Sequence, residues 1–158
     1  MMVLKSARRF FIFGGGEGLV FASGTFASYY FGVQELTVDA VRGVLSRLRF
    51  TGSSESDVQE IMDIAFERAF TGSYKREHHL GASGRPDFFF PSLGLVVEVK
   101  VGKSGGGATR VWTQISNYAK HDSVRQILFA TVSRKSAQVL PPVVGGVPVS
   151  FVILNSAF

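Results

Sequence analysis

The stretch RPDFFFPSLGLVVEVKVGKSGGG, residues 85–107, decides the fold, and it contains both an acidic and a glycine-rich candidate site. Residues 95–101 are apolar except for Glu98 and Lys100, which predicts a strand. Because side chains alternate along a strand, Glu98 and Lys100 share one face. If the aromatic residues after Asp87 pair with this strand as a hairpin, Asp87 lies beside Glu98. The stretch therefore predicts two carboxylates and one ammonium group on one face of a sheet.

Two neighbouring carboxylates are suited to a hard divalent cation. Asp87, Glu98 and the backbone carbonyl of Val99 supply oxygen ligands of the kind that Mg²⁺ prefers. The chain has no cysteine, so thiolate metal sites are excluded. Such a metal stabilises charge on a phosphate and lowers the pKa of bound water, as phosphodiester hydrolysis requires. Lys100 is expected to position the water or stabilise that charge. The alternative is a turn aspartate and a Glu–Lys pair on an exposed strand face.

The segment Gly102-Lys103-Ser104 does not fit a nucleotide-phosphate loop. Such a loop needs a glycine five positions before Gly102, where the chain has Val97. Three more glycines separate Ser104 from the next predicted helix, so its amides would not lie at a helix N-terminus. Lys103 is expected to be either a contact to the DNA backbone or a plain surface lysine.

The composition favours one domain with a basic surface. A chain of 158 residues, 46% of them hydrophobic, can bury a sizeable core. The net charge of +5 is concentrated in residues 100–135, which carry seven basic residues against Asp122 alone. Basic blocks are usually solvated faces, but beside a phosphate-cutting site this one suits DNA. The expected DNA contacts are Lys103, Arg110, Lys120, Arg85 and His79.

The remaining pattern predicts an α/β domain with a mixed sheet. The expected elements are helices at 38–48 and 109–120, a further helix that begins after Ser53 or Ser54, and strands at 73–80, 86–90, 95–101, 126–132 and 147–154. A turn is expected at 81–84. The expected buried stripe of the second helix is Val58, Ile61, Met62, Ala65 and Ala69. Ser53 or Ser54 is expected to cap the second helix. Residues 1–52 are expected to form an N-terminal extension with hairpin-like strands in its glycine- and aromatic-rich part. This extension would pack on the core, residues 53–158, or join two copies of the chain.

The first residues combine basic side chains with an apolar run. Glu17 and its neighbouring glycines interrupt that run, so a membrane-spanning helix is not expected there. The first dozen residues contain arginine and no acid, which also fits an organellar presequence as the minor alternative. We expect a cytoplasmic protein of prokaryotic or viral type.

Three motifs together resemble the PD-(D/E)XK nuclease superfamily. They begin with RPD at 85–87, which is followed by EVK at 98–100. Glu55, at the head of the preceding predicted helix, is similar to the superfamily's first-helix glutamate. The sequence QISNY at 114–118 is similar to the Gln-apolar-x-x-Tyr element of RecB-type nucleases. The resemblance covers about residues 53–132, and the N-terminal segment does not match it.

The resemblance implies a restriction-endonuclease-like αβββαβ core and a metal-dependent deoxyribonuclease of the RecB or Holliday-junction-resolvase type. Cleavage would leave 5′-phosphate ends, with Mg²⁺ as the metal and Mn²⁺ as a substitute. Branched DNA in recombination or repair would be a fitting substrate, and a homodimer would favour paired cuts. The implied site residues are Glu55, Asp87, Glu98, Val99 through its carbonyl, Lys100, Gln114 and Tyr118.

Two functions stay open at this point. One is the metal-dependent deoxyribonuclease, and the other is an inactive nuclease fold that binds nucleic acid or a protein partner. Carboxylates facing a polyanion have no purpose in a binding module, so their retention favours the first. Taken singly, Glu55 also fits a solvated helix-dipole carboxylate, Gln114 a helix-surface glutamine, and Tyr118 a half-buried tyrosine.

Overall fold

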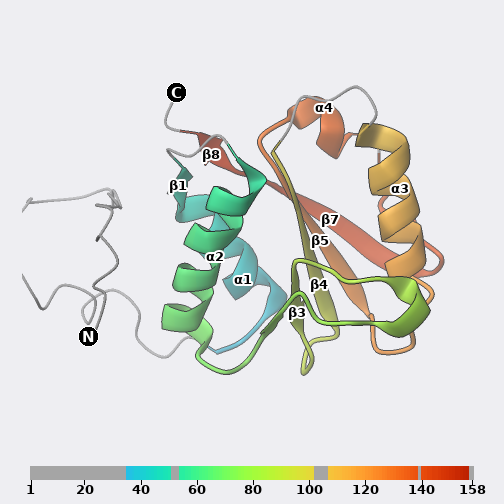
Figure 1. Ribbon diagram of the computed structural model, residues 1–158, viewed down its shortest axis with the longest axis horizontal. Coiled ribbons are helices and arrows are strands. Elements are labelled where there is room, and N and C mark those ends of the chain that lie inside the picture. Colours follow the sequence, from blue (N-terminus) through green and yellow to red (C-terminus); the bar gives the residue numbers. More distant parts are fainter. Residues whose placement is uncertain (1–34, 51–53, 102–106, 139, 157–158) are drawn as a thin grey trace, which may run out of the picture.

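A computed structural model describes residues 35–50, 54–101, 107–138 and 140–156. They form an α/β fold in which helices flank both faces of a mixed sheet (Figure 1). Six strands form this sheet in the order β2-β3-β4-β5-β7-β6. The predicted hairpin strands of the N-terminal extension, and Lys103 with most of its glycine-rich loop, lie outside the described residues.

The elements have the following bounds. The helices are α1 (Val38–Arg47), α2 (Glu55–Phe70), α3 (Gly107–Tyr118) and α4 (Arg134–Ala137), with a 3₁₀ turn at Gly81–Ser83. The strands are β1 (Arg49–Phe50), β2 (Lys75–Arg76), β3 (Phe88–Phe90), β4 (Leu95–Lys100), β5 (Gln126–Thr131), β6 (Val143–Val144), β7 (Val147–Ile153) and β8 (Asn155–Ser156). None of the helices in the described ranges is long and apolar enough to cross a membrane.

The predicted hairpin is present as β3 and β4. The two strands are antiparallel, and Phe88 lies opposite Val97. Gly94 makes the turn possible because its φ of +59° lies in the left-handed region, and an added Cβ would stand 2.7 Å from the Ser123 backbone oxygen. Beyond the hairpin, β4, β5 and β7 run parallel. The hairpin is therefore joined directly to the parallel centre of the sheet.

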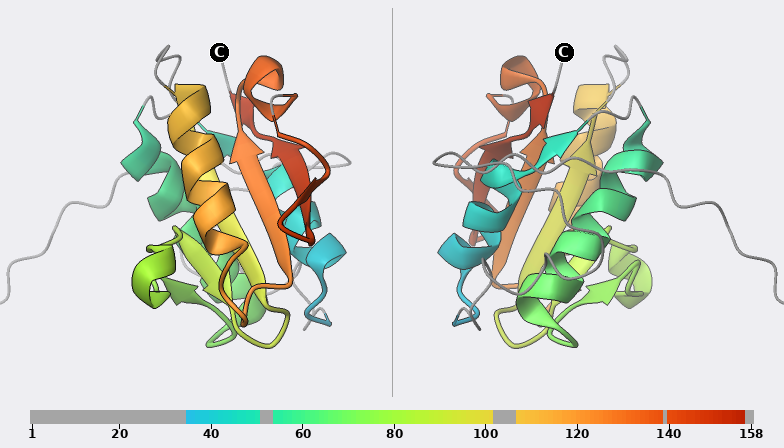
Figure 2. Two further views of the ribbon diagram at one scale, coloured as in Figure 1. Left: turned by 90° about the vertical axis from the view of Figure 1, so that its right-hand side faces the viewer. Right: turned by 90° about the vertical axis from the view of Figure 1, so that its left-hand side faces the viewer.

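Alternation along β4 sends its side chains into two different cores. Val97 and Val99 belong to the apolar cluster that includes α1 and α2, whereas Val96 packs in the cluster that includes α3. Figure 2 shows α1 and α2 on one face of the sheet and α3 on the other. Glu98 and Lys100 therefore lie on the α3 face, as the alternation predicts. The face is not exposed, because Glu98 is only 1% accessible.

The two N-terminal helices begin at capping side chains. Thr37 Oγ1 accepts a hydrogen bond from Ala40 N, and Ser54 Oγ accepts one from Asp57 N, so Ser54 is the cap of α2. Val44 of α1 is buried in the same cluster as Met62 of α2. Part of the segment predicted as an extension thus contributes to the main core.

Chain segments far apart in sequence close the fold. The strands β1 and β8 form a separate parallel pair in which Arg49 lies opposite Asn155. Asn155 Nδ2 also donates to the Ser46 carbonyl oxygen at 2.7 Å. The end of the described chain is therefore tied to the connection that follows α1.

Several predicted boundaries are wrong. The strand expected at 73–80 is reduced to β2, because Glu77 adopts a φ of +48° and the chain then leaves the sheet. The turn expected at 81–84 is present and contains the 3₁₀ turn, whereas α3 begins and ends two residues before the predicted 109–120. The short elements α4, β6 and β8 were not predicted.

Candidate active site

The candidate site lies at the C-terminal half of β4, between the first turns of α2 and the side of α3. Asp87 directly precedes β3. Continuing the register beyond the Phe88–Val97 pair places Asp87 opposite Glu98. Cross-strand neighbours share a face, so the hairpin brings the two carboxylates together as the sequence predicts.

Asp87 is held by one hydrogen-bond donor on each carboxylate oxygen. Gln59 Nε2 donates to Oδ1 at 2.8 Å, and Val99 N donates to Oδ2 at 2.7 Å. Burial and the nearby charge of Glu98 raise the pKa of Asp87 to about 7, against the opposing effects of the Val99 N–H and Lys100. Asp87 is therefore a carboxylate whose charge is poorly compensated in the metal-free protein.

Glu98 is more deeply buried than Asp87 and has two polar neighbours. Its Oε1 lies 3.1 Å from Lys100 Nζ, and its Oε2 accepts a hydrogen bond from the Tyr118 hydroxyl at 3.0 Å. Burial raises the pKa of Glu98, although Lys100 and Tyr118 act in the opposite direction. Both carboxylates of the pair thus hold protons more tightly than exposed acids do.

Lys100 bridges the strand and the helix that precedes it. Its Nζ donates to Glu55 Oε1 at 2.9 Å, so Glu55 points inward from the first turn of α2. Burial alone would lower the pKa of Lys100, but Glu98 and Glu55 outweigh burial and raise it. The raised pKa keeps Lys100 a cation in this arrangement. Glu55 is therefore an ion-pair partner of Lys100 and not the purely solvated helix-dipole carboxylate of the alternative interpretation.

The two α3 residues lie one helical turn apart and have different surroundings. Tyr118 is 2% exposed, and its hydroxyl donates to Glu98 and lies 3.3 Å from the Arg85 carbonyl oxygen. Burial and Glu98 raise the pKa of Tyr118, which keeps the hydroxyl a donor. Gln114 Oε1 is buried without a hydrogen-bond partner among the described residues. Tyr118 therefore belongs to the site directly, and it is not half-buried.

Gln59 is a site residue that the sequence patterns did not reveal. It follows Glu55 by four residues, so the two side chains emerge from the same side of α2 one turn apart. That spacing is the signal that could have identified it. The contact itself joins residues 28 apart in the chain, which no local pattern specifies.

The structure does not gather the predicted DNA contacts into one group. Arg85 and His79 are exposed near the hairpin, and Arg85 lies 3.9 Å from an exposed carboxylate. Arg110 is exposed near the start of α3, whereas Lys120 follows its end. A helix of 12 residues is about 18 Å long, so these two charges lie well apart. Lys103 lies outside the described residues.

The donor set fits a hard cation. Within the described ranges, no three His, Asp or Glu side chains stand close enough together to bind one metal ion. Asp87 and Glu98 form a smaller pair. The N–H of Val99 points to Asp87. A strand residue directs its N–H and C=O to the same edge, so the Val99 carbonyl faces Asp87 as well. The half-buried carboxylate of Asp87, the buried carboxylate of Glu98 and a carbonyl oxygen match the hard oxygen ligands that Mg²⁺ prefers.

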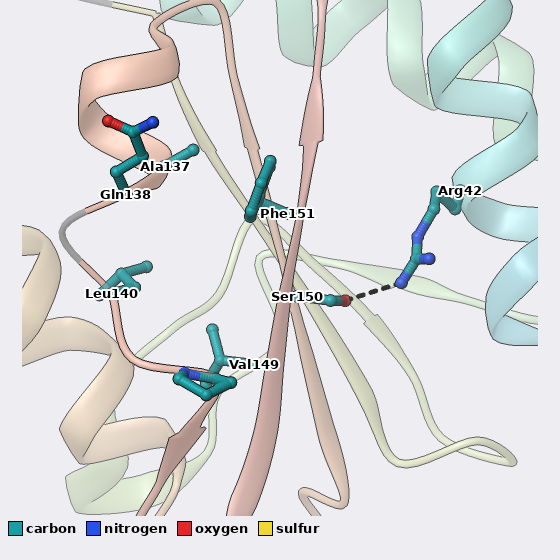
Figure 3. A pocket seen from close by; sticks show the side chains of 8 residues that line it. Arg42, Ala137, Gln138, Leu140, Val149, Ser150 and Phe151 are labelled. Atoms are coloured by element: carbon teal, nitrogen blue, oxygen red, sulfur yellow. Dashed lines mark hydrogen bonds between the residues drawn. The ribbon is translucent and has the colours of Figure 1, made fainter.

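A surface hollow of about 430 Å³ lies elsewhere, along β7. Its lining includes Leu140, Pro142, Val149 and Phe151, with Arg42 across the strand (Figure 3). Arg42 Nη2 donates to Ser150 Oγ at 3.0 Å. The lining contains no carboxylate or histidine, so the hollow lacks the groups that hydrolysis requires. We therefore place the candidate site at the carboxylate pair.

No protein-family model matches this sequence, and no curated protein or solved structure matches it.

Proposed function

We propose that the protein is a Mg²⁺-dependent deoxyribonuclease with the restriction-endonuclease-like core of the PD-(D/E)XK superfamily. The chain order α2, β2, β3, β4, α3, β5 supports this core, because it follows the αβββαβ sequence of elements. The observation that carries the function is the partly buried cluster in which Asp87 lies beside the fully buried Glu98, and Lys100 connects Glu98 to Glu55.

Each residue of the cluster has a distinct part in this proposal. Asp87, Glu98 and the Val99 carbonyl hold the metal ion. When bound, Mg²⁺ supplies charge stabilisation at the phosphate and lowers the pKa of a coordinated water. Lys100 places a positive charge beside the scissile phosphate, and Glu55 fixes the position of that charge. In this proposal a water attacks phosphorus and loses a proton to solvent, while the P–O3′ bond breaks and the 3′-oxygen takes up a proton. The products are a 5′-phosphate and a 3′-hydroxyl.

Residues of α3 complete the proposed site. Tyr118 fixes the orientation of Glu98 through its hydroxyl. Gln114 has a buried Oε1 that accepts no hydrogen bond within the described part of the chain, and this acceptor suits an ordered water. Exposed basic residues such as Arg85 and Arg110 supply contacts to the DNA backbone.

The proposal is tested with the full-length protein on duplex, single-stranded and four-way-junction DNA. Cleavage is expected with Mg²⁺ or Mn²⁺, and is expected to be lost in EDTA and in Asp87→Ala. The matched control is Asp122→Ala, which removes an exposed aspartate outside the cluster and should cleave normally. No cleavage of any substrate by the wild type, or cleavage that survives Asp87→Ala, contradicts the proposal. Faster cleavage of the junction than of the linear duplex would favour a role in recombination or repair.

A second outcome would favour the non-enzymatic alternative. In that case the protein binds DNA with an affinity that falls steeply with salt, and neither Mg²⁺ nor Mn²⁺ binds. Light scattering on the same sample tests the proposed homodimer.

A further inference from the structure

We infer that Gln59 is a positioning residue that holds Asp87 in the orientation required to bind the metal ion. This inference rests on the proposed function, because it concerns the same site. It adds a residue from the second turn of α2 that none of the three sequence motifs contains.

Asp87 needs such a support because it lies outside the regular strand. Glu98 is within β4, where the strand fixes its direction and Lys100 and Tyr118 fix its two oxygens. Asp87 precedes β3, and its backbone is held by the hydrogen bond from Glu77 N to its carbonyl oxygen at 2.9 Å. The direction of the Asp87 carboxylate is therefore set by the donors that reach its side chain.

Those donors leave the carboxylate able to bind a cation. Each carboxylate oxygen offers about two lone-pair sites. Gln59 Nε2 occupies one site on Oδ1, and Val99 N occupies one on Oδ2, so each oxygen keeps a further site. Both donors are neutral amides, so they orient Asp87 without cancelling its negative charge. A lysine or arginine at position 59 would compete electrostatically with the metal ion, and an amide does not.

The helix gives this contact a rigid base. Val58 and Met62, on either side of Gln59 in the sequence, are 1% and 0% exposed and anchor α2 in the core. Glu55, one turn earlier, holds Lys100. A single packed helix thus fixes both the aspartate and the lysine of the proposed site.

The test compares Mn²⁺ binding by the wild type with that of Gln59→Met. Methionine keeps the length of the side chain and removes the donor. Titration calorimetry on the full-length protein is expected to show about 10- to 100-fold weaker Mn²⁺ binding, the usual effect of losing a partner of a metal ligand. The control is Glu60→Met, which makes the same residue at the adjacent exposed position and should bind Mn²⁺ like the wild type. Thermal unfolding establishes that each variant is folded at the titration temperature.

The possible results separate this inference from the proposed function. If the wild type itself binds no Mn²⁺, the proposed function fails. If the wild type binds Mn²⁺ and folded Gln59→Met binds it with an affinity within twofold of the wild type, the positioning role is refuted. This holds even if the variant has a lower thermal midpoint, because that change alone shows only a structural role. Gln59→Asn replaces Gln59→Met if the latter does not fold. Its amide is one methylene too short to reach Asp87, so the same loss of affinity is expected, and unchanged affinity again refutes the role.

Discussion

Replacing Asp87 with asparagine should stabilise the metal-free protein at pH 8 while removing its metal binding. Burial and Glu98 raise the pKa of Asp87 from its ordinary value of 3.8 to about 7. Between these two values the unfolded chain has lost the proton that the folded chain keeps. The free energy of unfolding therefore falls as pH rises from about 4 to about 7, and the full loss persists above that range. A difference of about 3 pH units corresponds to about 4 kcal/mol.

Asparagine resembles the protonated aspartate, so most of that loss should be recovered. The amide has one acceptor oxygen, however, and can serve either Gln59 or the Val99 N–H but not both. An unpaired buried donor costs about 1–2 kcal/mol. We expect Asp87→Asn to gain about 2–3 kcal/mol at pH 8, or about 5–10 °C in Tm for a chain of this size.

Urea denaturation at pH 5 and pH 8 measures this effect, with the exposed Asp122→Asn as control. The gain should shrink at pH 5, where the wild-type carboxyl is protonated. Saturating Mg²⁺ at pH 8 should also reduce the difference in stability between Asp87→Asn and the wild type, because the ion binds the folded wild type and not the variant. The reasoning is refuted if Asp87→Asn is less stable than the wild type at pH 8, or if its gain is the same at both pH values.

The other predictions concern the neighbours of Asp87 and the hairpin turn. Tyr118→Phe leaves a buried oxygen of Glu98 without its donor, so urea denaturation should show a free energy of unfolding lower by about 1–3 kcal/mol. A decrease below about 0.5 kcal/mol would contradict the contact. Lys100→Met should destabilise the protein more at pH 8 than at pH 5, because the raised pKa of Glu98 lets this carboxylate take up a proton in acid. Equal shifts of the urea midpoint at both pH values would count against this. Gly94→Ala should lower the free energy of unfolding by at least about 2 kcal/mol, since its Cβ would stand 2.7 Å from a backbone oxygen. Gly72→Ala is the control, because Gly72 has a similar positive φ and nothing within 4 Å of its added Cβ. Its loss of stability in the same urea assay should be smaller.

The hairpin could be predicted from the sequence because its determinants are local. Alternation along β4 is a property of any strand, so the shared face of Glu98 and Lys100 follows from their spacing alone. The turn at Gly94 then sets the register that brings Asp87 to Glu98. The predicted stripe of α2 is equally local, and its residues Val58, Met62 and Ala65 are buried.

The parts that could not be predicted depend on tertiary contacts. The four-residue spacing from Glu55 places Gln59 on the same side of α2, but its hydrogen bond to Asp87 joins residues 28 apart and depends on how α2 packs against the sheet. The residues around Glu77 have a strand-like pattern, but the reversal there ends β2 after Arg76. Two-residue strands such as β8 have no pattern of their own and form because a partner is present.

The contacts between distant segments delay the completion of folding until late in the synthesis of this domain. The Asn155–Ser46 and Arg42–Ser150 hydrogen bonds span 109 and 108 residues, and β7 is the parallel neighbour of β5. During translation α1 and α2 therefore leave the ribosome long before the strands that complete their core. Their apolar faces must wait several seconds at ordinary elongation rates of about 5–20 residues per second. This core is thus expected to form only after β7 has emerged, and the interval before then is when a chaperone would have the most exposed apolar surface to bind.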